Sequence, residues 1–266
     1  MTILKAFLFT ILLVAIEATL SLGFLSLNEV LNLSPDNLIH YGQITRIVTI
    51  LLEYFVILFL IFKLRFNQTS FFDRLRNIDS KTFLLVLVTV FGYKLLQKPL
   101  LDFNLIIDSI NNNVIEPING VNDKYKYVIG YKFIIAVILA PILEELFFRK
   151  ILFNGLLKKY SFAISAIISS LCFALVHWTP DLLRIIPMFI FGIICCLIYI
   201  KTKNIIYPIL FHFTGNLIST IVSIYSKQLF AFQQELNYNW IYWAAFMIGI
   251  GVTIFGIRKI TTANKM

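Results

Sequence analysis

The segment Ala140-Pro-Ile-Leu-Glu-Glu-Leu-Phe-Phe-Arg149 places two adjacent carboxylates and an arginine inside an otherwise apolar run. On a helix, Glu145 and Arg149 stand at i and i+4 with the acid first, which is the favourable order for an ion pair. Glu144 points about 100° away from that pair, because each helical residue turns by about that angle. Pro141 lacks a backbone N–H and is expected to kink or loosen the helix. Ionisable residues in an apolar span are costly, so this segment is expected to belong to a working site.

The composition is that of an integral membrane protein. Of the 266 residues, 59% are hydrophobic and 14% are charged, and the mean hydropathy is +0.85. Soluble domains are less apolar, and runs of about 20 apolar residues fit membrane-spanning helices. The net charge of +9 is therefore expected in cytoplasmic loops, not on a nucleic-acid-binding face. Cys172, Cys195 and Cys196 lie in apolar runs and are interpreted as buried packing residues, not as a disulfide framework.

Counting apolar runs predicts an all-α, polytopic integral membrane protein with about eight transmembrane helices. We expect a polar site in the fourth to seventh helices and a short interfacial helix in the long external loop 98–132. The first helix is interpreted as a retained span, because its apolar run is too long for a signal peptide. The chain is divided into N-terminal helices with the external loop (1–132), a helical core (133–224), and a last helix with a basic tail (225–266). The expected helices are 6–27, 44–62, 82–97, 133–157, 160–178, 182–200, 204–224 and 238–257.

The basic residues of the loops predict the orientation in the membrane. On the side of the two termini lie Lys5, Lys63, Arg65, Arg74, Arg76, Lys81, Lys158, Lys159, Lys201, Lys203, Arg258, Lys259 and Lys265. The other side carries Lys98, Lys124, Lys126, Lys132, Arg184 and Lys227. Positive charge gathers in cytoplasmic loops, so both termini are predicted to be cytoplasmic. The Ile-, Asn-, Lys- and Phe-rich composition points to an AT-rich genome, and hence to a bacterial cell membrane.

Two of the three histidines lie in apolar runs where they could carry chemistry. His177 ends the run Ser170-Leu-Cys-Phe-Ala-Leu-Val-His177, and His212 stands four residues before Asn216 on a predicted helix. A neutral imidazole suits general-base work or metal ligation. His40 follows a polar loop and is expected to have no special role.

Depth along the helices indicates that these groups can meet. If the fourth and fifth helices form a tight hairpin at 158–160, Glu144 lies about 21 Å and His177 about 26 Å from that turn. On the seventh helix, His212 lies about 12 Å and Asn216 about 18 Å from the cytoplasmic end. Helix tilt absorbs the remaining difference. We therefore expect one cavity inside the bilayer, somewhat nearer the cytoplasm.

The ordered set of motifs resembles the signature of the CPBP family. The motifs are Glu144-Glu145-x-x-x-Arg149 after Ala140-Pro, then Phe173-Ala-Leu-x-His177, then His212-x-x-x-Asn216. That family contains the CAAX prenyl endopeptidases and the bacterial Abi proteins of bacteriocin processing and immunity. The resemblance covers about 136–217, and Lys150 departs from it where the family often has glycine. It implies an intramembrane endopeptidase that cleaves a membrane-associated peptide or protein, in CAAX-type or bacteriocin or signal-peptide processing.

The resemblance also implies roles for six side chains, and makes 133–224 the catalytic core. A carboxylate in an apolar site holds a proton strongly and can act as a general base, and an asparagine amide is a normal oxyanion donor. Under this reading Glu144 and His177 activate a water, His212 and Asn216 stabilise the oxyanion, and Glu145 and Arg149 hold their helix in position.

The cofactor stays open at this stage. A divalent metal such as zinc could be held by Glu144, His177 and His212, or no cofactor could be needed. None of these residues has the His-Glu-x-x-His spacing of most zinc proteases.

Two other functions compete with the protease. A non-catalytic membrane protein, such as a bacteriocin-immunity factor, could retain the polar cluster as structure. A transporter is disfavoured, because the two halves of the chain show no repeat. The expected partners are a peptide or membrane-protein substrate and the lipid bilayer, with no nucleic acid. Glu53 is expected to pair with Arg46 on one helical face, and Glu17 has no obvious partner.

Overall fold

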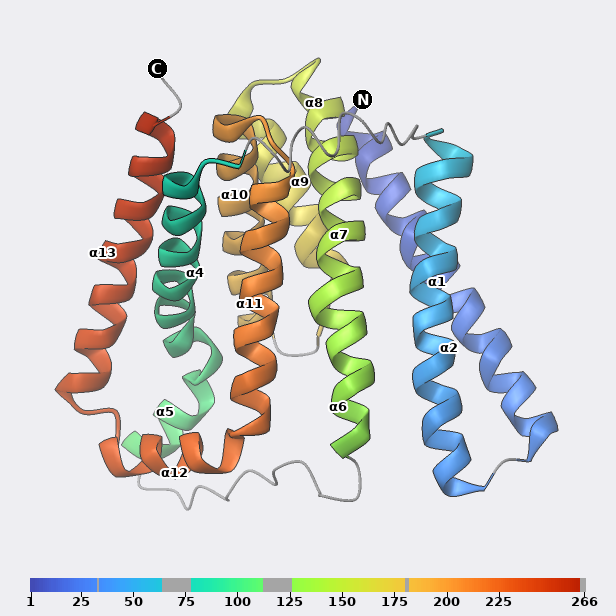
Figure 1. The fold of residues 1–266 in the computed structure, drawn as a ribbon, viewed down its shortest axis with the longest axis horizontal. Coiled ribbons are helices and arrows are strands. Elements are labelled where there is room, and N and C mark those ends of the chain that lie inside the picture. The colour runs from blue at the N-terminus through green and yellow to red at the C-terminus, as the bar shows by residue number, and fades with distance from the viewer. Residues whose placement is uncertain (33, 64–77, 112–125, 180–181, 264–266) are drawn as a thin grey trace.

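The chain forms an all-helical bundle (Figure 1). The computed structural model describes residues 1–32, 34–63, 78–111, 126–179 and 182–263, and no strand occurs among them. Five of the loop residues used to predict the orientation lie outside the described residues, namely Arg65, Arg74, Arg76, Lys124 and Lys265. The three cysteines are buried and free, as predicted.

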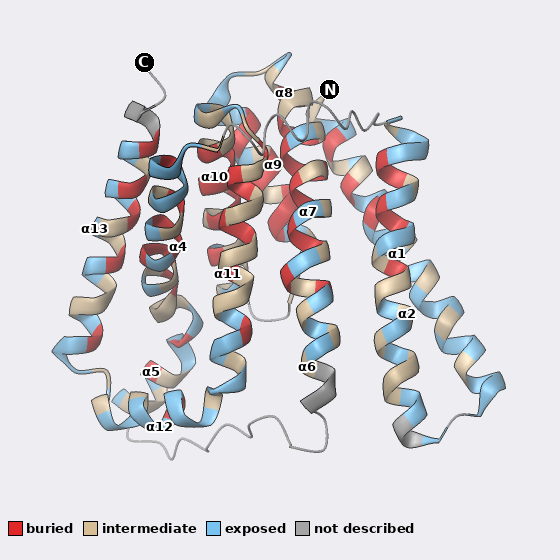
Figure 2. Cartoon of the chain, viewed as in Figure 1, coloured by how far each residue is buried: buried red, intermediate tan, exposed pale blue. Residues whose placement is uncertain are grey.

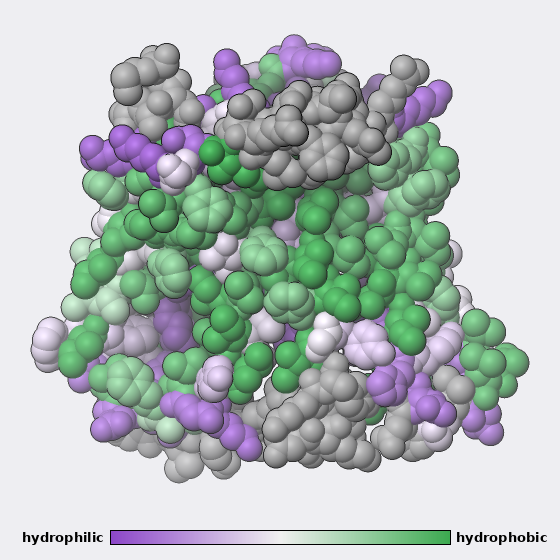
Figure 3. Space-filling view, in the orientation of Figure 1, coloured by the Kyte–Doolittle hydropathy of each residue, from purple (hydrophilic) through white to green (hydrophobic). Residues whose placement is uncertain are grey.

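Within the described ranges, six helices are long and apolar enough to cross a membrane, and α9 (Phe162–Val176) is apolar but shorter. Figure 3 shows a band of hydrophobic side chains between two more polar ends. The prediction of an all-α, multi-pass membrane protein is confirmed, whereas the count of eight spans stays a prediction. The six long helices are α1 (Ile3–Leu31), α2 (Pro35–Phe55) with its continuation η1 (Val56–Ile61), α4 (Ser80–Leu101), α10 (Ile185–Thr202), α11 (Ile206–Ile224) and α13 (Trp240–Ala263).

The stretch 126–157 is one helix whose hydrogen-bond pattern alternates between α and π. The amide of Ala140 donates to the carbonyl of Ile135, five residues back. Pro141 follows without an N–H, so the expected loosening takes the form of π turns on either side of it. Such turns are frequent at functional sites. The segments are α6 (Lys126–Lys132), η3 (Phe133–Leu139), α7 (Ala140–Glu145), η4 (Leu146–Phe153) and α8 (Asn154–Leu157).

This long helix and α9 form the tight hairpin expected from the sequence. The helix ends at Leu157, and Ser161 caps α9 by accepting a hydrogen bond from the Ile164 amide at 3.5 Å. Helix α1 begins and α13 ends at the same end of the bundle (Figure 1). This agrees with the prediction that both termini lie on one side of the membrane.

The opposite end of the bundle carries two short helices, α5 and α12, next to a buried carboxylate. Asp102 accepts hydrogen bonds from Lys98, Gln233 and Tyr242, each at 2.9 Å. It thereby ties the end of α4 to α12 and α13. The range 98–132 contains a short helix, α5, and its expected place at the membrane interface stays a prediction, whereas α12 was not expected. The short helices are α5 (Phe103–Ile110), η5 (Leu182–Arg184) and α12 (Ser226–Leu236).

Helices α4 and α13 pack closely through glycines. A Cβ added at Gly249 would lie 2.7 Å from the backbone nitrogen of Leu96, and one at Gly92 would lie 2.7 Å from the backbone nitrogen of Thr253. Small residues let two helix backbones approach in a membrane. Gly251, on the same helix α13, has open space around it.

We expect Gly249→Val to destabilise the protein and Gly251→Val to have little effect. The valine at 249 would push α13 away from α4, and overpacking of this kind typically costs about 1–3 kcal/mol or more. Thermal unfolding of both variants in one detergent measures the difference. Equal melting temperatures would contradict the assigned α4–α13 contact.

Candidate active site

A cavity of about 780 Å³ lies between the α1–α2 hairpin and the central helices. Glu144, His177, His212 and Asn216 all line it, so the residues singled out in the sequence are brought together. Figure 2 shows the buried residues concentrated in the central helices, while the halves of α1 and α2 farther from the termini are exposed or intermediate. The cavity occupies this looser part of the bundle.

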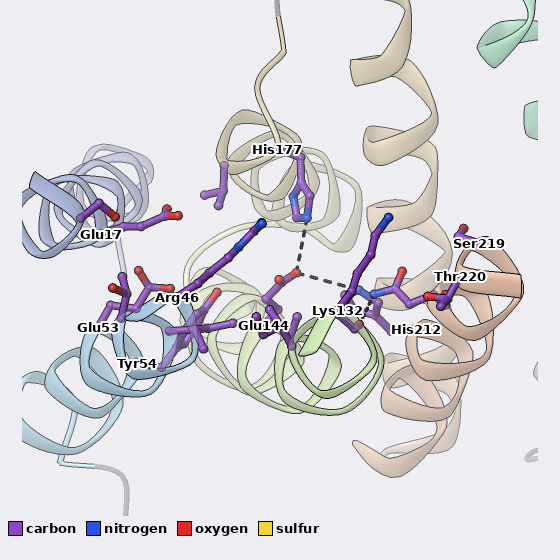
Figure 4. A pocket seen from close by; sticks show the side chains of 18 of the residues that line it. Glu17, Arg46, Glu53, Tyr54, Lys132, Glu144, His177, His212, Ser219 and Thr220 are labelled. Atoms are coloured by element: carbon purple, nitrogen blue, oxygen red, sulfur yellow. Dashed lines mark hydrogen bonds and ion pairs between the residues drawn. The ribbon is translucent and has the colours of Figure 1, made fainter. Parts of the chain in front are cut away.

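The centre of the site is the Oε2 atom of Glu144 (Figure 4). It lies 3.7 Å from Nε2 of His177 and 3.9 Å from Nε2 of His212. These separations are too long for direct hydrogen bonds, and polar groups this far apart are commonly bridged by a water. The carboxylate is buried, and its Oε2 has no hydrogen-bond partner among the described residues.

The tautomer of His177 follows from its second ring nitrogen. Nδ1 lies 2.9 Å from the backbone carbonyl of Phe173, one turn earlier in α9. A carbonyl oxygen only accepts hydrogen bonds, so Nδ1 must carry the proton. In the neutral ring, Nε2 is then unprotonated and turns its lone pair toward Glu144.

His212 is held in the same tautomer by a different group. Its Nδ1 lies 3.0 Å from Oε1 of Glu145, whose Oε2 lies 2.9 Å from Nε of Arg149. An ionised carboxylate only accepts, so Nδ1 donates and Nε2 again offers a lone pair to Glu144. The predicted pair of Glu145 and Arg149 is present, and Glu145 additionally orients His212. Sequence reasoning missed this second contact.

Arg149 is fully buried in an aromatic shell. Its guanidinium carbon lies 4.8 Å from the ring centre of Phe173 and 5.9 Å from that of Phe148. Cations are attracted to aromatic faces, but a buried guanidinium still needs a counter-charge. Glu145 supplies it from one turn earlier.

Asn216 donates a hydrogen bond to a backbone carbonyl that Pro141 leaves without a donor. In the π pattern of η3, the bond after Ala140 to Ile135 would run from residue 141 to the carbonyl of Ala136. Proline has no N–H to donate, and Nδ2 of Asn216 donates to that carbonyl instead, at 2.6 Å. An amide NH₂ group has two N–H donors, so the second remains for a ligand.

The charged side chains of α2 that line the cavity do not form the ion pair expected from the sequence. Glu53 and Arg46 both line the cavity, but no ion pair joins them among the described residues. Glu53 is 5% exposed, and its Oε2 has no hydrogen-bond partner in the described part of the chain. Glu17, which had no predicted partner, lines the same wall from α1 (Figure 4). His40 lies outside the lining and contacts Tyr131, with 3.2 Å between Nδ1 and the hydroxyl.

The cavity extends away from the termini. From Glu144 its lining runs to Asn28, Leu38 and Leu101, at the far ends of α1, α2 and α4. With cytoplasmic termini, this part of the cavity faces the outside of the cell. The sequence placed the cavity somewhat nearer the cytoplasm, but helix rise alone could not show toward which end of the bundle the cavity extends.

Glu144, His177 and His212 resemble metal ligands in the chemistry of their side chains but not in their spacing. Imidazoles that expose one lone pair and donate from the other nitrogen are typical of metal ligands. The separations of 3.7 and 3.9 Å exceed the ~3.4 Å between ligand atoms around a tetrahedral zinc. Among the described residues, no group of three or more His, Cys, Asp or Glu side chains could hold a metal ion.

Comparison with known proteins identifies the segment that carries the site. Residues 128–218 match the family described as type II CAAX prenyl endopeptidase Rce1-like. This segment belongs to the CPBP family. The CPBP segment contains the two glutamates, Arg149, both site histidines and Asn216, and excludes α1, α2 and α4.

The relatives resemble this chain over a limited part. YdiL of Bacillus subtilis, described as a candidate membrane peptidase, is 34% identical over 102 residues, or 38% of this chain and 41% of YdiL. The membrane-embedded CAAX protease MroQ of Staphylococcus aureus is 36% identical over 86 residues, or 30% of this chain and 34% of MroQ. The chain thus spans less than half the length of either relative. No solved structure matches it.

Proposed function

We propose that the chain is an intramembrane endopeptidase that hydrolyses a peptide bond in a membrane-associated peptide or protein. The observation that carries this is the convergence of Glu144 Oε2 with two imidazole lone pairs inside a cavity. The similarity of residues 128–218 to CAAX prenyl endopeptidases supports the same reaction.

In this proposal a water occupies the gap between Glu144 and the two histidines. Three acceptor atoms surround a molecule with two hydrogens, so the water is polarised and one acceptor is free to take a proton. The water oxygen attacks the peptide carbonyl carbon and forms the C–O bond. Glu144, with His177 beside it, takes the proton that the water releases. The same proton then passes to the leaving amine as the C–N bond breaks.

The oxyanion needs hydrogen-bond donors. The second N–H of Asn216 is one. In the tautomer described, His212 has no N–H left for the oxyanion, because its Nδ1 proton is committed to Glu145 and its Nε2 is an acceptor. Glu145 and Arg149 would act as positioning residues, since neither lines the cavity.

Cleavage of a quenched-fluorescent peptide library by the protein in detergent tests the proposal. We expect hydrolysis by the natural protein, at least about 10²-fold less by His177→Gln, and near-natural rates in His40→Gln, the histidine outside the cavity. Each reaction is run with and without a chelator, which tests the metal separately. Absence of hydrolysis by folded protein would favour the alternative, a binding protein of the bacteriocin-immunity type.

We also propose that both termini are cytoplasmic, on the loop-charge asymmetry. A fluorescent-protein fusion at the C-terminus should then fluoresce, and Asn237→Cys, between α12 and α13, should react with an impermeant maleimide in intact cells. Background labelling should be low because Cys172, Cys195 and Cys196 are buried. Labelling only after lysis would reverse the orientation and turn the cavity toward the cytoplasm.

A further inference from the structure

The cavity wall formed by α1 and α2 carries two carboxylates that the proposed hydrolysis does not use. Glu53 is 5% exposed and lines the cavity, and its Oε2 has no hydrogen-bond partner among the described residues. Glu17 lies next to it (Figure 4), and both Glu17 and Glu144 are within electrostatic range of Glu53. Burying an ionised carboxylate without a partner is expensive, so Glu53 needs a hydrogen-bond donor or a positive group next to it.

Arg46, the cation on the same wall, does not supply that group. It stands seven residues before Glu53, about 10 Å away along the α2 axis. In Figure 4 its side chain points toward His177, away from Glu53. No ion pair of Arg46 with Glu53 or Glu17 is found within the described ranges.

The opposite wall is basic. Lys94 of α4 donates to the hydroxyl of Ser219 at 2.7 Å, and Lys132 of α6 donates to that of Ser223 at 3.5 Å. Both lysines line the cavity and have serine partners in these contacts. Glu144 therefore lies between an α1–α2 wall with two carboxylates and Arg46, and an α4–α6 wall with two lysines and no acid among its lining residues.

We propose that Glu53, with Glu17 beside it, binds a basic side chain of the substrate peptide, a lysine ammonium or an arginine guanidinium, next to the scissile bond. Such a group would give the buried carboxylate its partner and would be repelled by Lys94 and Lys132, so the peptide would bind in one direction. One buried and one exposed carboxylate suit a single organic cation better than a divalent ion, which takes six or more oxygen ligands. The identity of the ligand as a peptide rests on the proposed function. Glu53 and Glu17 lie outside the CPBP segment.

Peptide-binding measurements test this inference separately from catalysis. An uncharged, apolar, fluorescein-labelled decapeptide is compared with derivatives carrying one lysine, or norleucine as its neutral counterpart, at each position in turn. Affinity is measured on Glu144→Gln protein, which should turn the peptides over at least about 10²-fold more slowly. At one position we expect lysine to bind about 10- to 100-fold tighter than norleucine, the range of a charge-assisted hydrogen bond.

Further substitutions in the Glu144→Gln protein show which side chain produces the preference for lysine. Glu53→Gln should abolish it, Glu17→Gln should reduce it several-fold, and Glu53→Lys should replace it with a preference for glutamate in the peptide. Glu29→Gln, an exposed acid of α1 outside the cavity lining, should leave it intact. Thermal melting of each variant verifies folding.

The results distinguish the two proposals. A lysine preference that persists in folded Glu53→Gln, or its absence at every position, would overturn the subsite. If the preference depends on Glu53 but the natural protein hydrolyses none of the peptides, the subsite stands and the peptidase proposal fails.

Discussion

Glu144→Gln is expected to leave the protein folded and to lower peptide hydrolysis by about 10²-fold or more, the usual scale for a lost general base. The glutamine keeps the size of the side chain but cannot take a proton from water. Folding should be nearly unchanged, because Glu144 Oε2 makes no hydrogen bond within the described structure that the change would break. Removing a buried charge can even raise the melting temperature.

Thermal melting and peptide cleavage should be measured on Glu144→Gln in the detergent used for the natural protein. A melting temperature equal to or above the natural one, with cleavage reduced, is the expected combination. Full activity in Glu144→Gln would end the water-activation mechanism and leave the non-catalytic binding protein as the better account. A loss of activity that follows a loss of folded protein would instead assign Glu144 a structural role.

Local features of the structure could be predicted from sequence. The apolar runs gave the long helices because membrane spans have a length set by the bilayer. The pair of Glu145 and Arg149 could be foreseen because i and i+4 are neighbours on any helix. Helix rise and a tight hairpin, both fixed by chain geometry, indicated that Glu144, His177 and His212 could lie at depths from which they can meet.

Contacts between distant segments could not be predicted in the same way. Glu145 meets His212 across 67 residues, and Asn216 meets the Ala136 carbonyl across 80. The second contact exists because the helix before Pro141 is π rather than α, which leaves a particular carbonyl without its donor. A motif that names Asn216 as an oxyanion donor does not contain that information, although Pro141 gave a hint that one carbonyl nearby would need a partner.

The position of the cavity was also beyond the sequence. Glu53 and Arg46 share a helical face, and on that pattern an ion pair was the simpler expectation. Whether two such side chains pair or turn into a cavity depends on how far α1 and α2 stand from the core. That separation depends on packing between helices, which no periodicity within one helix records.

The second large effect is expected from Glu145, which differs from its neighbour in having two partners. Its Oε2 lies 2.9 Å from Nε of Arg149 and its Oε1 lies 3.0 Å from Nδ1 of His212, and both Glu145 and Arg149 are fully buried. Arginine does not lose its proton in proteins, so Glu145→Gln leaves a buried guanidinium without a counter-charge. The expected cost is about 3–5 kcal/mol of unfolding free energy, with less folded protein and a lower melting temperature.

A double variant of Glu145 and Arg149 separates the effect of their charges from the effect of their packing. Arg149→Met alone should also destabilise, because it leaves the Glu145 carboxylate buried without its cation. Glu145→Gln combined with Arg149→Met removes both charges and should recover most of the lost stability, since buried ion pairs are often replaceable by apolar groups. Activity should not recover, because a neutral amide holds His212 less firmly than a carboxylate. Additive losses in the double variant would show that the two side chains act independently, and the assignment of Glu145 as the shared anchor of Arg149 and His212 would then be wrong.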